Sequence, residues 1–481
     1  MTQAVWTQPT HLEEAQPTGW SIRRYLWLLL GLAIASGPFL LLAKMVGMPL
    51  LGVAPLALVV LGLTVAKPEA GLLMMLMLFP MEDAMSVIPR TLTVIRLLGV
   101  YVLGVYAVHA VTGKRLVLNE PYVRRHAILV LVMWVSILLS RYPLEGMTAM
   151  QTPLAFVAFT VLALSLIHDW RMVDNAFVFM FIGAVAGATL GLVLEYTAGQ
   201  SLSSERISTG TGRLGVGEMS NPNSFGRAIG LGLLLLPYLW WRFHGLLAKT
   251  LICAGALLIA VAVVKSGARA VWVSLMLTLP AAFWFAETRL TARTAKTVAI
   301  VVVAVVALVV ALHMGLVSSR IMERFSMLNQ GVQAGGRSTI WRVCIAAFMD
   351  HPILGMGHTV FGATSVEVAV RHSLSLPHNV SRDPHSTYLA VLADMGIMGA
   401  LSYGAILVYM ARSLWRFPGS ALRGTMIGVF LFLLIVGITG TSLHNKSFWM
   451  PFAIMAAAVA VHRRQQAQQA FEPMGSEGPH G

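Results

Sequence analysis

The sequence predicts an all-α membrane protein, a polytopic bundle of about 12–14 transmembrane helices. Of its 481 residues, 57% are hydrophobic and only 11% are charged, and the mean hydropathy is +0.75. This composition lies outside the range of soluble globular proteins. Because the apolar runs follow one another with short gaps, we expect one transmembrane domain at 25–463. A cytoplasmic segment at 1–24 precedes it, and a disordered cytoplasmic tail at 464–481, low in apolar residues, follows it.

The first helix is expected at 25–46, directly after Arg23 and Arg24. The stretch before it carries Glu13 and Glu14, unlike the basic start of a cleaved signal peptide, so the first helix should be retained. The further apolar runs lie at 49–66, 70–89, 92–112, 124–140, 150–168, 173–196, 223–243, 249–265, 269–287, 296–317, 386–411, 424–442 and 447–462. The first two of these, 49–66 and 70–89, can also be re-entrant or half-helices.

The distribution of basic residues predicts the topology. If the spans alternate from a cytoplasmic start, most Lys and Arg of the short connections fall inside, as the positive-inside rule requires. Both termini are then cytoplasmic, and the long segments 197–226 and 318–385 lie on the outer face. The net charge of +14 is largely this anchoring pattern. Because the chain has no recognition helix, RNP sequence or zinc spacing, nucleic acid is rejected as a partner.

Five basic residues scattered along the chain fall at or just outside the outer face: Arg213, Arg227, Arg269, Arg337 and His385. An arginine fork stays charged and matches phosphate oxygens, so several arginines around one cavity would bind a diphosphate. A lipid-linked diphosphate suits this position, because its headgroup lies at the interface and its tail lies in the bilayer. The sequence also offers no cluster of metal-ligand spacing and no pair of carboxylates at glycosidase-like spacing.

Simpler interpretations stand beside this hypothesis. Outer-face arginines commonly reach lipid headgroups, and we favour that role for Arg206, Arg320 and Arg371. For Arg269, in the short polar break KSGAR, substrate binding and membrane anchoring are both open. Arg337 opens an amphipathic stretch that is expected to be an interfacial helix. Its apolar positions are Ile340, Trp341, Cys344 and Phe348.

His385 follows Pro384 and is expected to begin a helix, with Leu389 and Leu392 near its own face. A histidine there can act as a base near neutral pH, or it can only cap and hydrogen-bond. Asp394 lies about half a turn out of phase with His385, so we do not pair the two. The Asn221-Pro222-Asn223 turn is expected to end the outer segment and cap the next span.

Four segments together carry a family resemblance: SNPNSFGRAIGLGLLLLP, KSGARAVW, RSTIWRVCIAAFMDHPILGMGHTVF and PHSTYLAVLADMGIMG. Their order on the predicted outer face resembles the O-antigen ligase and polysaccharide polymerase superfamily of bacterial envelope glycosyltransferases. The spacing from His385 to Gly396 matches the ligase form of the last motif. The family more often has Asn after the histidine and Glu further on, whereas Ser386 and Asp394 stand here.

The resemblance implies a GT-C-like, metal-independent, inverting glycosyltransferase of the bacterial inner membrane, with its active site facing the periplasm and the segment 318–385 as a large periplasmic loop containing short amphipathic helices. The donor would be a glycan on undecaprenyl diphosphate, and no cofactor is implied. The acceptor would be a hydroxyl on lipid A core. By position, Arg269 and Arg337 match the family's arginines, and His385 matches its motif histidine and candidate base. Arg213 is our further candidate for the diphosphate.

Two alternatives remain. A polymerase would use another lipid-linked glycan as the acceptor. A flippase or transporter of lipid-linked sugars would place ionisable residues near the bilayer midplane. Because the predicted spans are nearly free of charge at mid-depth and the polar residues gather at one face, we favour interfacial chemistry on a lipid-linked substrate.

Overall fold

The computed structural model describes residues 49–88, 92–113, 116–198, 214–215, 221–287, 337–374, 376, 383–441 and 443–471. The predicted all-α class is confirmed. Within these residues, eight helices are long and apolar enough to cross a membrane, and the strands are confined to one antiparallel hairpin, β1 (Ser86–Ile88) and β2 (Leu92–Thr93). The spans predicted at 25–46 and 296–317 lie outside the described residues.

The helices follow the predicted apolar runs closely. In chain order they are α2 (Pro49–Ala66), α3 (Pro68–Leu78), the 3-10 helix η2 (Phe79–Met85), α4 (Val94–Val111), α5 (Pro121–Leu138), α6 (Pro143–Ala149), α7 (Gln151–Leu166), α8 (Trp170–Ala198), α10 (Pro222–Leu234), α11 (Leu236–Arg242), α12 (Leu246–Ser266), α13 (Arg269–Ala286), α16 (Arg337–Asp350), α17 (Val360–Arg371), α18 (Thr387–Arg416), α19 (Ala421–Ile438) and α20 (Lys446–Phe471).

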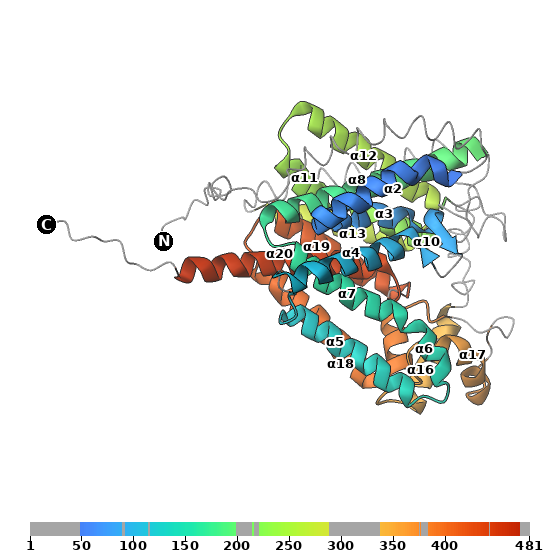
Figure 1. Ribbon diagram of the computed structural model, residues 1–481. Helices are drawn as coiled ribbons and strands as arrows, with labels where there is room; N and C mark the ends of the chain where they lie inside the picture. The colour runs from blue at the N-terminus through green and yellow to red at the C-terminus, as the bar shows by residue number, and fades with distance from the viewer. Residues whose placement is uncertain are drawn as a thin grey trace, which may run out of the picture.

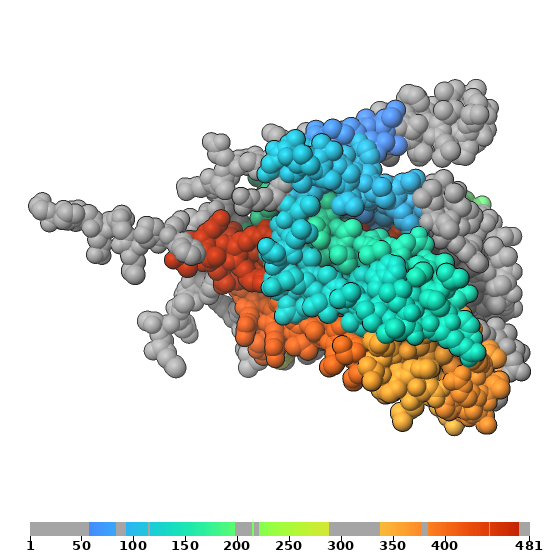
Figure 2. All heavy atoms as spheres, turned by 60° about the horizontal axis from the view of Figure 1, so that its bottom comes forward, coloured from blue at the N-terminus to red at the C-terminus, as the bar shows by residue number. Residues whose placement is uncertain are grey.

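The short helix α6, the helices α16 and α17, and the β-hairpin lie toward one end of the bundle (Figure 1). In Figure 1, α6, α16, α17 and the hairpin lie at the right, whereas the C-terminal part of α20 projects at the left. Figure 2 shows α16 and α17, coloured yellow to orange, together at one corner of the surface. Because α16 and α17 belong to the segment 318–385, the short amphipathic helices expected there are present.

Ion pairs between distant segments agree with the predicted alternation of spans. Each pair joins two residues that the alternation puts on the same side, as expected if connections at one face meet one another. On the predicted inner side the pairs are Arg463–Glu120 (2.5 Å) and Arg242–Asp174 (2.8 Å). On the predicted outer side they are Lys265–Glu195 (2.8 Å) and Arg141–Glu367 (2.9 Å).

One open alternative is decided, and two predicted elements need correction. The run at 70–89 is a half-helix, one of the alternatives left open for it, because α3 gives way to η2 and then to β1. The run at 223–243 is two helices, since α10 ends at Leu234 ahead of Pro237, which has no backbone N–H to donate to the carbonyl of Leu233 and so interrupts the helical hydrogen bonds. The tail predicted to be disordered from 464 is helical as far as Phe471. Its basic residues Arg463 and Arg464 both contact Glu120, which holds this part of α20 against the start of α5.

The core is built around α20. Every residue from Ser447 to Val461 is buried, so this helix is surrounded by its neighbours. Trp449 stacks on His126 of α5 at 4.5 Å between ring centroids, and its indole N–H donates to the carbonyl of Leu443 at 2.8 Å. The central helix thus fixes the short connection that enters it from α19.

Candidate functional site

The turn that carries Arg269 is built by the end of α12. Gly267 adopts the left-handed conformation (φ 61°) that ends the helix, and α13 then begins at Arg269 itself. The Arg269 side chain is half-buried. Lys265, in the last turn of α12, is bound by Glu195 at 2.8 Å. The charge of Lys265 is therefore already paired within the protein.

Arg213 lies outside the described residues, but its neighbour Leu214 is held at this same turn. The Leu214 N–H donates to the carbonyl of Lys265 at 3.0 Å, and the Leu214 side chain is buried. The chain on the C-terminal side of Arg213 is thus attached to the turn before Arg269.

The first turns of α10 pack directly on the Arg269 turn. A Cβ on Gly226 would lie 2.8 Å from Ser266 Oγ and 3.1 Å from Ala268 Cβ, so only glycine permits this approach. The next residue, Arg227, donates from Nε to the carbonyl of Asn223 and from Nη2 to Ser224 Oγ, both at 3.2 Å. As predicted, Asn221 caps α10, because its side-chain oxygen accepts the N–H of Asn223.

The remaining nitrogen of Arg227 has no such partner. Its Nη1 atom is buried and makes no hydrogen bond to any described residue. It faces Gly440, where a Cβ would lie 2.9 Å from Nη1. A buried donor without an acceptor costs free energy, so its presence indicates a place for an oxygen ligand. The sequence put Arg227 at this face but gave no reason to prefer it over the other arginines.

The start of α18 also contacts Gly440. Thr387 Oγ1 donates to the carbonyl of Gly440 at 2.7 Å, so the end of α19 joins Arg227 of α10 to the first residue of α18. His385 precedes that residue by two positions and is exposed. The structure therefore brings together α10 with Arg227, the Arg269 turn and the segment that carries His385.

The local backbone at His385 corrects one prediction. His385 does not begin the helix, because α18 starts at Thr387 with Ser386 in extended conformation at its cap. His385 itself has φ 51°, in the left-handed region. Non-glycine residues adopt this region rarely, and such residues cluster at active and binding sites. The ring is therefore not on one helical face with Leu389 and Leu392.

Arg337 is positioned by different elements. It is the first residue of α16, whose apolar face packs on the N-terminal half of α18. Ile340 and Cys344 are buried there as predicted, in one cluster with Ala393 of α18. Burial lowers the pKa of Arg337, but a guanidinium remains charged at neutral pH. Arg337 thus sits, half-buried, on a helix packed against the half of α18 that follows His385.

The loop between α16 and α17 inserts into a break in α18. Gly396 has φ 59° and ψ −152°, which interrupts the helix. Four backbone hydrogen bonds fill the break: Met356 N–Ala393 O (2.9 Å), Gly357 N–Asp394 O (2.9 Å), Ile397 N–Pro352 O (2.8 Å) and Met398 N–Ile353 O (3.2 Å). The glycine-containing segments around Gly355 and Gly396 are therefore paired with each other through their backbones.

Asp394 has a structural partner of its own. Its Oδ1 accepts the N–H of Phe361 at 3.2 Å, in the first turn of α17. Thr359 precedes α17 with φ 67° and makes no side-chain cap, so Asp394 supplies the acceptor that the helix start lacks. This agrees with leaving Asp394 unpaired with His385.

His358 was not singled out from the sequence. It is fully buried, both ring nitrogens lack hydrogen bonds to described residues, and the ring of His444 lies 4.8 Å away between centroids. Burial, followed by the neighbouring His444, lowers the pKa of His358 well below the ordinary histidine value. No sequence signal marked this pair, because its members come from segments far apart in the chain.

Arg371, for which contact with lipid headgroups stays a prediction, makes two ion pairs. It binds Asp350 of α16 at 3.1 Å and, within α17, Glu367 at 3.0 Å. Arg206 and Arg320 lie outside the described residues. Across the described part of the chain, no group of three or more His, Cys, Asp or Glu side chains is arranged to hold a metal ion.

Residues 254–404 match the family model described as O-antigen ligase. The match confirms the resemblance to the O-antigen ligase superfamily and contains Arg269, Arg337 and His385. Together with the eight apolar helices, it identifies a multi-pass membrane protein. Among curated proteins, none matches this chain.

Proposed function

We propose, from the O-antigen ligase segment at residues 254–404, that this membrane protein transfers a glycan from undecaprenyl diphosphate to an acceptor hydroxyl at the periplasmic face of the inner membrane. The observation that carries the proposal is the buried, unpartnered Nη1 of Arg227 beside the Arg269 turn and the start of α18. Such a donor suits an anionic oxygen of the donor lipid.

In this proposal the arginines bind the diphosphate. Arg269 and Arg337 match the family's positions, Arg213 adjoins Leu214 at the same turn, and Arg227 adds the buried donor. Each guanidinium offers parallel N–H groups to phosphate oxygens. Negative charge grows on the diphosphate as its bond to the sugar breaks, so a fixed array of cations stabilises the transition state more than the ground state.

The reaction itself is a single displacement. The acceptor oxygen forms a bond to the anomeric carbon, the bond from that carbon to the diphosphate oxygen breaks, and undecaprenyl diphosphate leaves with the electron pair. His385 takes the acceptor's proton. One displacement inverts the anomeric configuration, and the step requires no metal because the diphosphate is already a good leaving group.

We further propose that the acceptor is a sugar hydroxyl of lipid A core, which would make the reaction O-antigen ligation in lipopolysaccharide biosynthesis. A polymerase would run the same displacement with a second lipid-linked glycan as the acceptor. The two differ in product: a ligase releases the completed glycan from its carrier, whereas a polymerase leaves the longer glycan on undecaprenyl diphosphate.

A reconstituted transfer assay tests the proposal. Full-length protein, lipid-linked glycan and lipid A core are mixed, and the products are separated by mass. We expect glycan on lipid A core and free undecaprenyl diphosphate in equal amounts. Arg227→Lys should lower the rate at least about tenfold, because an ammonium cannot reproduce the fork. Arg141→Lys, at an exposed arginine that pairs with Glu367, is the matched control.

Two outcomes would overturn the assignment. A longer glycan that remains on undecaprenyl diphosphate would identify a polymerase. Intact donor that crosses the bilayer without any new glycosidic bond would identify a flippase.

A further inference from the structure

The connection from α19 to α20 contacts three parts of the candidate site. Gly440 lies against the Nη1 atom of Arg227, and its carbonyl accepts a hydroxyl from the first residue of α18. Four residues further on, the ring of His444 packs on the ring of His358, with 4.8 Å between their centroids. The arginine of α10, the start of α18 and the loop before α17 therefore meet at one short segment.

His444 lies in a recess of the protein. The residue is exposed, yet burial lowers the pKa of its imidazole below the ordinary histidine value, an effect that the charge of Asp383 opposes. Water thus reaches a ring that protein atoms surround on most sides. Asp383, two residues before His385, is close enough to act on this ring electrostatically. His444 is therefore accessible and lies near the segment of the candidate base.

The ring of His358 supports His444 from inside the protein. His358 is fully buried, and neither of its ring nitrogens has a hydrogen bond to a described residue. Helix α6 packs on its backbone, because a Cβ on Gly146 would lie 3.0 Å from the carbonyl of His358. A ligand that enters the recess therefore contacts His444, and His358 fixes the orientation of that ring.

The connection carries a second polar group that is suited to hydroxyls. Thr441, directly after Gly440, has a buried Oγ1 atom without a hydrogen bond to any described residue. A hydroxyl and a neutral imidazole each donate and accept hydrogen bonds, as sugar hydroxyls do, whereas a guanidinium only donates and matches phosphate oxygens. The chemistry along the connection therefore changes from phosphate binding beside Arg227 to groups that match a saccharide.

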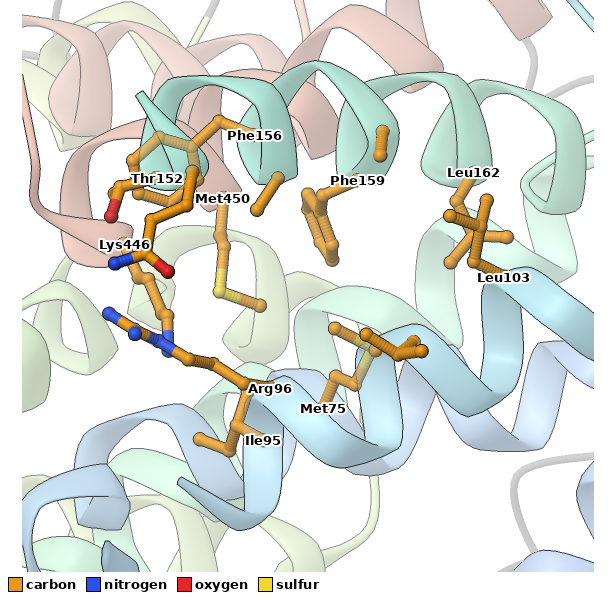
Figure 3. Close-up of a pocket in the computed structure, with 15 residues that line it drawn as sticks. Met75, Ile95, Arg96, Leu103, Thr152, Phe156, Phe159, Leu162, Lys446 and Met450 are labelled. Carbon is orange, nitrogen blue, oxygen red and sulfur yellow. The ribbon is translucent and has the colours of Figure 1, made fainter. Parts of the chain in front are cut away.

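The cavity between α4 and α7 offers few such partners. This groove of ≈ 360 Å³ has Arg96, Thr152 and Lys446 at one end (Figure 3). Most of its lining is apolar and includes Ile95, Leu103, Phe156, Phe159 and Leu162. Because α20 begins at Lys446, the connection ends at the polar end of the groove. The polar groups that match a sugar lie in the connection itself.

We propose that His444 binds a hydroxyl of a reacting sugar, with Thr441 beside the same sugar and His358 as the positioning residue of His444. The inference rests on the proposed glycan transfer, in which a sugar is bonded directly to the diphosphate. Four residue steps separate Gly440 from His444, so their Cα atoms lie at most about 14 Å apart. The donor's first sugar and the acceptor's sugar offer the same hydroxyl chemistry, and the experiment distinguishes them.

Substrate protection of a thiol at this position tests the inference. The full-length variant His444→Cys, with the exposed Cys253 replaced by serine, reacts with N-ethylmaleimide, and the labelling rate is followed by mass. Lipid-linked glycan or lipid A core, at about ten times its dissociation constant, should slow labelling about tenfold. Undecaprenyl diphosphate without glycan should leave the rate unchanged. Protection by the lipid-linked glycan assigns the donor's sugar, and protection by lipid A core assigns the acceptor's.

The matched control is His351→Cys in the same background. His351 is another exposed histidine of the segment predicted to lie outside, directly after α16 and at the opposite end of that helix from Arg337. Its labelling rate should be the same with and without each ligand.

A kinetic comparison tests the hydrogen bond itself. His444→Phe keeps an aromatic ring against His358 but loses both ring nitrogens. It should raise the KM of the protecting substrate about fivefold, the value of one hydrogen bond, and leave kcat within about twofold. His444→Asn, whose amide still donates and accepts, should keep KM closer to the wild-type value.

Three results would overturn the proposal. Slowing by undecaprenyl diphosphate equal to that by the lipid-linked glycan would put His444 at the diphosphate instead. Labelling that neither glycan ligand slows would remove the saccharide contact, and an unchanged KM in His444→Phe would show that the ring only packs. The transfer assay on the wild type decides the proposed function separately, so a wild type that transfers glycan while these tests fail refutes this inference alone.

Discussion

Replacing Gly355 with alanine should detach the loop between α16 and α17 from the break in α18 and so destabilise the protein. Gly355 has φ 68°, and a Cβ there would lie 2.3 Å from the carbonyl carbon of Asp394 and 2.3 Å from the nitrogen of Met395. Both are backbone atoms, so no side-chain rotation relieves the clash. If the four hydrogen bonds in the break are lost at about 0.5–1.5 kcal/mol each, the cost is about 2–6 kcal/mol. The substitution therefore removes a large part of typical folding stability.

The measurement is thermal unfolding of the purified protein in detergent, followed by the loss of monodisperse elution. The matched control is Gly404→Ala in the same helix, because a Cβ at Gly404 meets nothing within 4 Å. That change should be neutral or stabilising by up to about 1 kcal/mol. If Gly355→Ala melts at the same temperature as Gly404→Ala, the loop does not hold the broken helix, and the structural role assigned to both glycine motifs is wrong.

Three further predictions follow from the same structure. Arg269→Lys and Arg337→Lys should each lower the rate of glycan transfer at least about tenfold, with a normal amount of protein in the membrane. Wild-type rates in both variants would refute the proposal that these arginines bind the diphosphate. Cysteines placed at Ser326 and Ser420, in a background lacking the exposed Cys253, should be labelled from opposite sides of the membrane; labelling from one side contradicts the topology. Burial lowers the pKa of His358, so the unfolded chain takes up the proton first, and stability should fall as the pH drops below about 6.5. His358→Phe should flatten that acid loss of melting temperature, and an unchanged slope would show that another group causes it.

Hydropathy predicted the all-α membrane class, because apolar runs long enough to cross a membrane rarely have another structural role. It did not predict where the helices are interrupted. Hydropathy cannot distinguish a spanning helix from α3 followed by η2, since both bury the same apolar residues. The end of α3 packs tightly on α8, where a Cβ on Gly183 would lie 2.3 Å from the carbonyl of Met77. That contact depends on residues about a hundred positions apart.

The sequence predicted those candidate site residues whose type alone indicates the chemistry. Arg269 and Arg337 stood out because permanent charges are rare in such a chain, and His385 because it was expected to begin a helix at the polar face. Arg227 is important because its Nη1 is buried beside Gly440, at the end of α19. The two residues are far apart in the sequence, so only the structure shows this contact. Gly396 and Gly355 were visible as motif glycines, but the backbone pairing that requires them links segments on different elements.

The most direct test of the central claim is the initial rate of glycan transfer as a function of pH, for the wild type and for His385→Gln. If His385 takes the acceptor's proton, the wild-type profile has an acid limb, because the protonated imidazole cannot accept another proton. The glutamine variant, which can hydrogen-bond but cannot accept that proton, should lose the limb and be slower by about 10²–10⁴-fold. A glutamine variant that keeps both the rate and the acid limb would contradict the account.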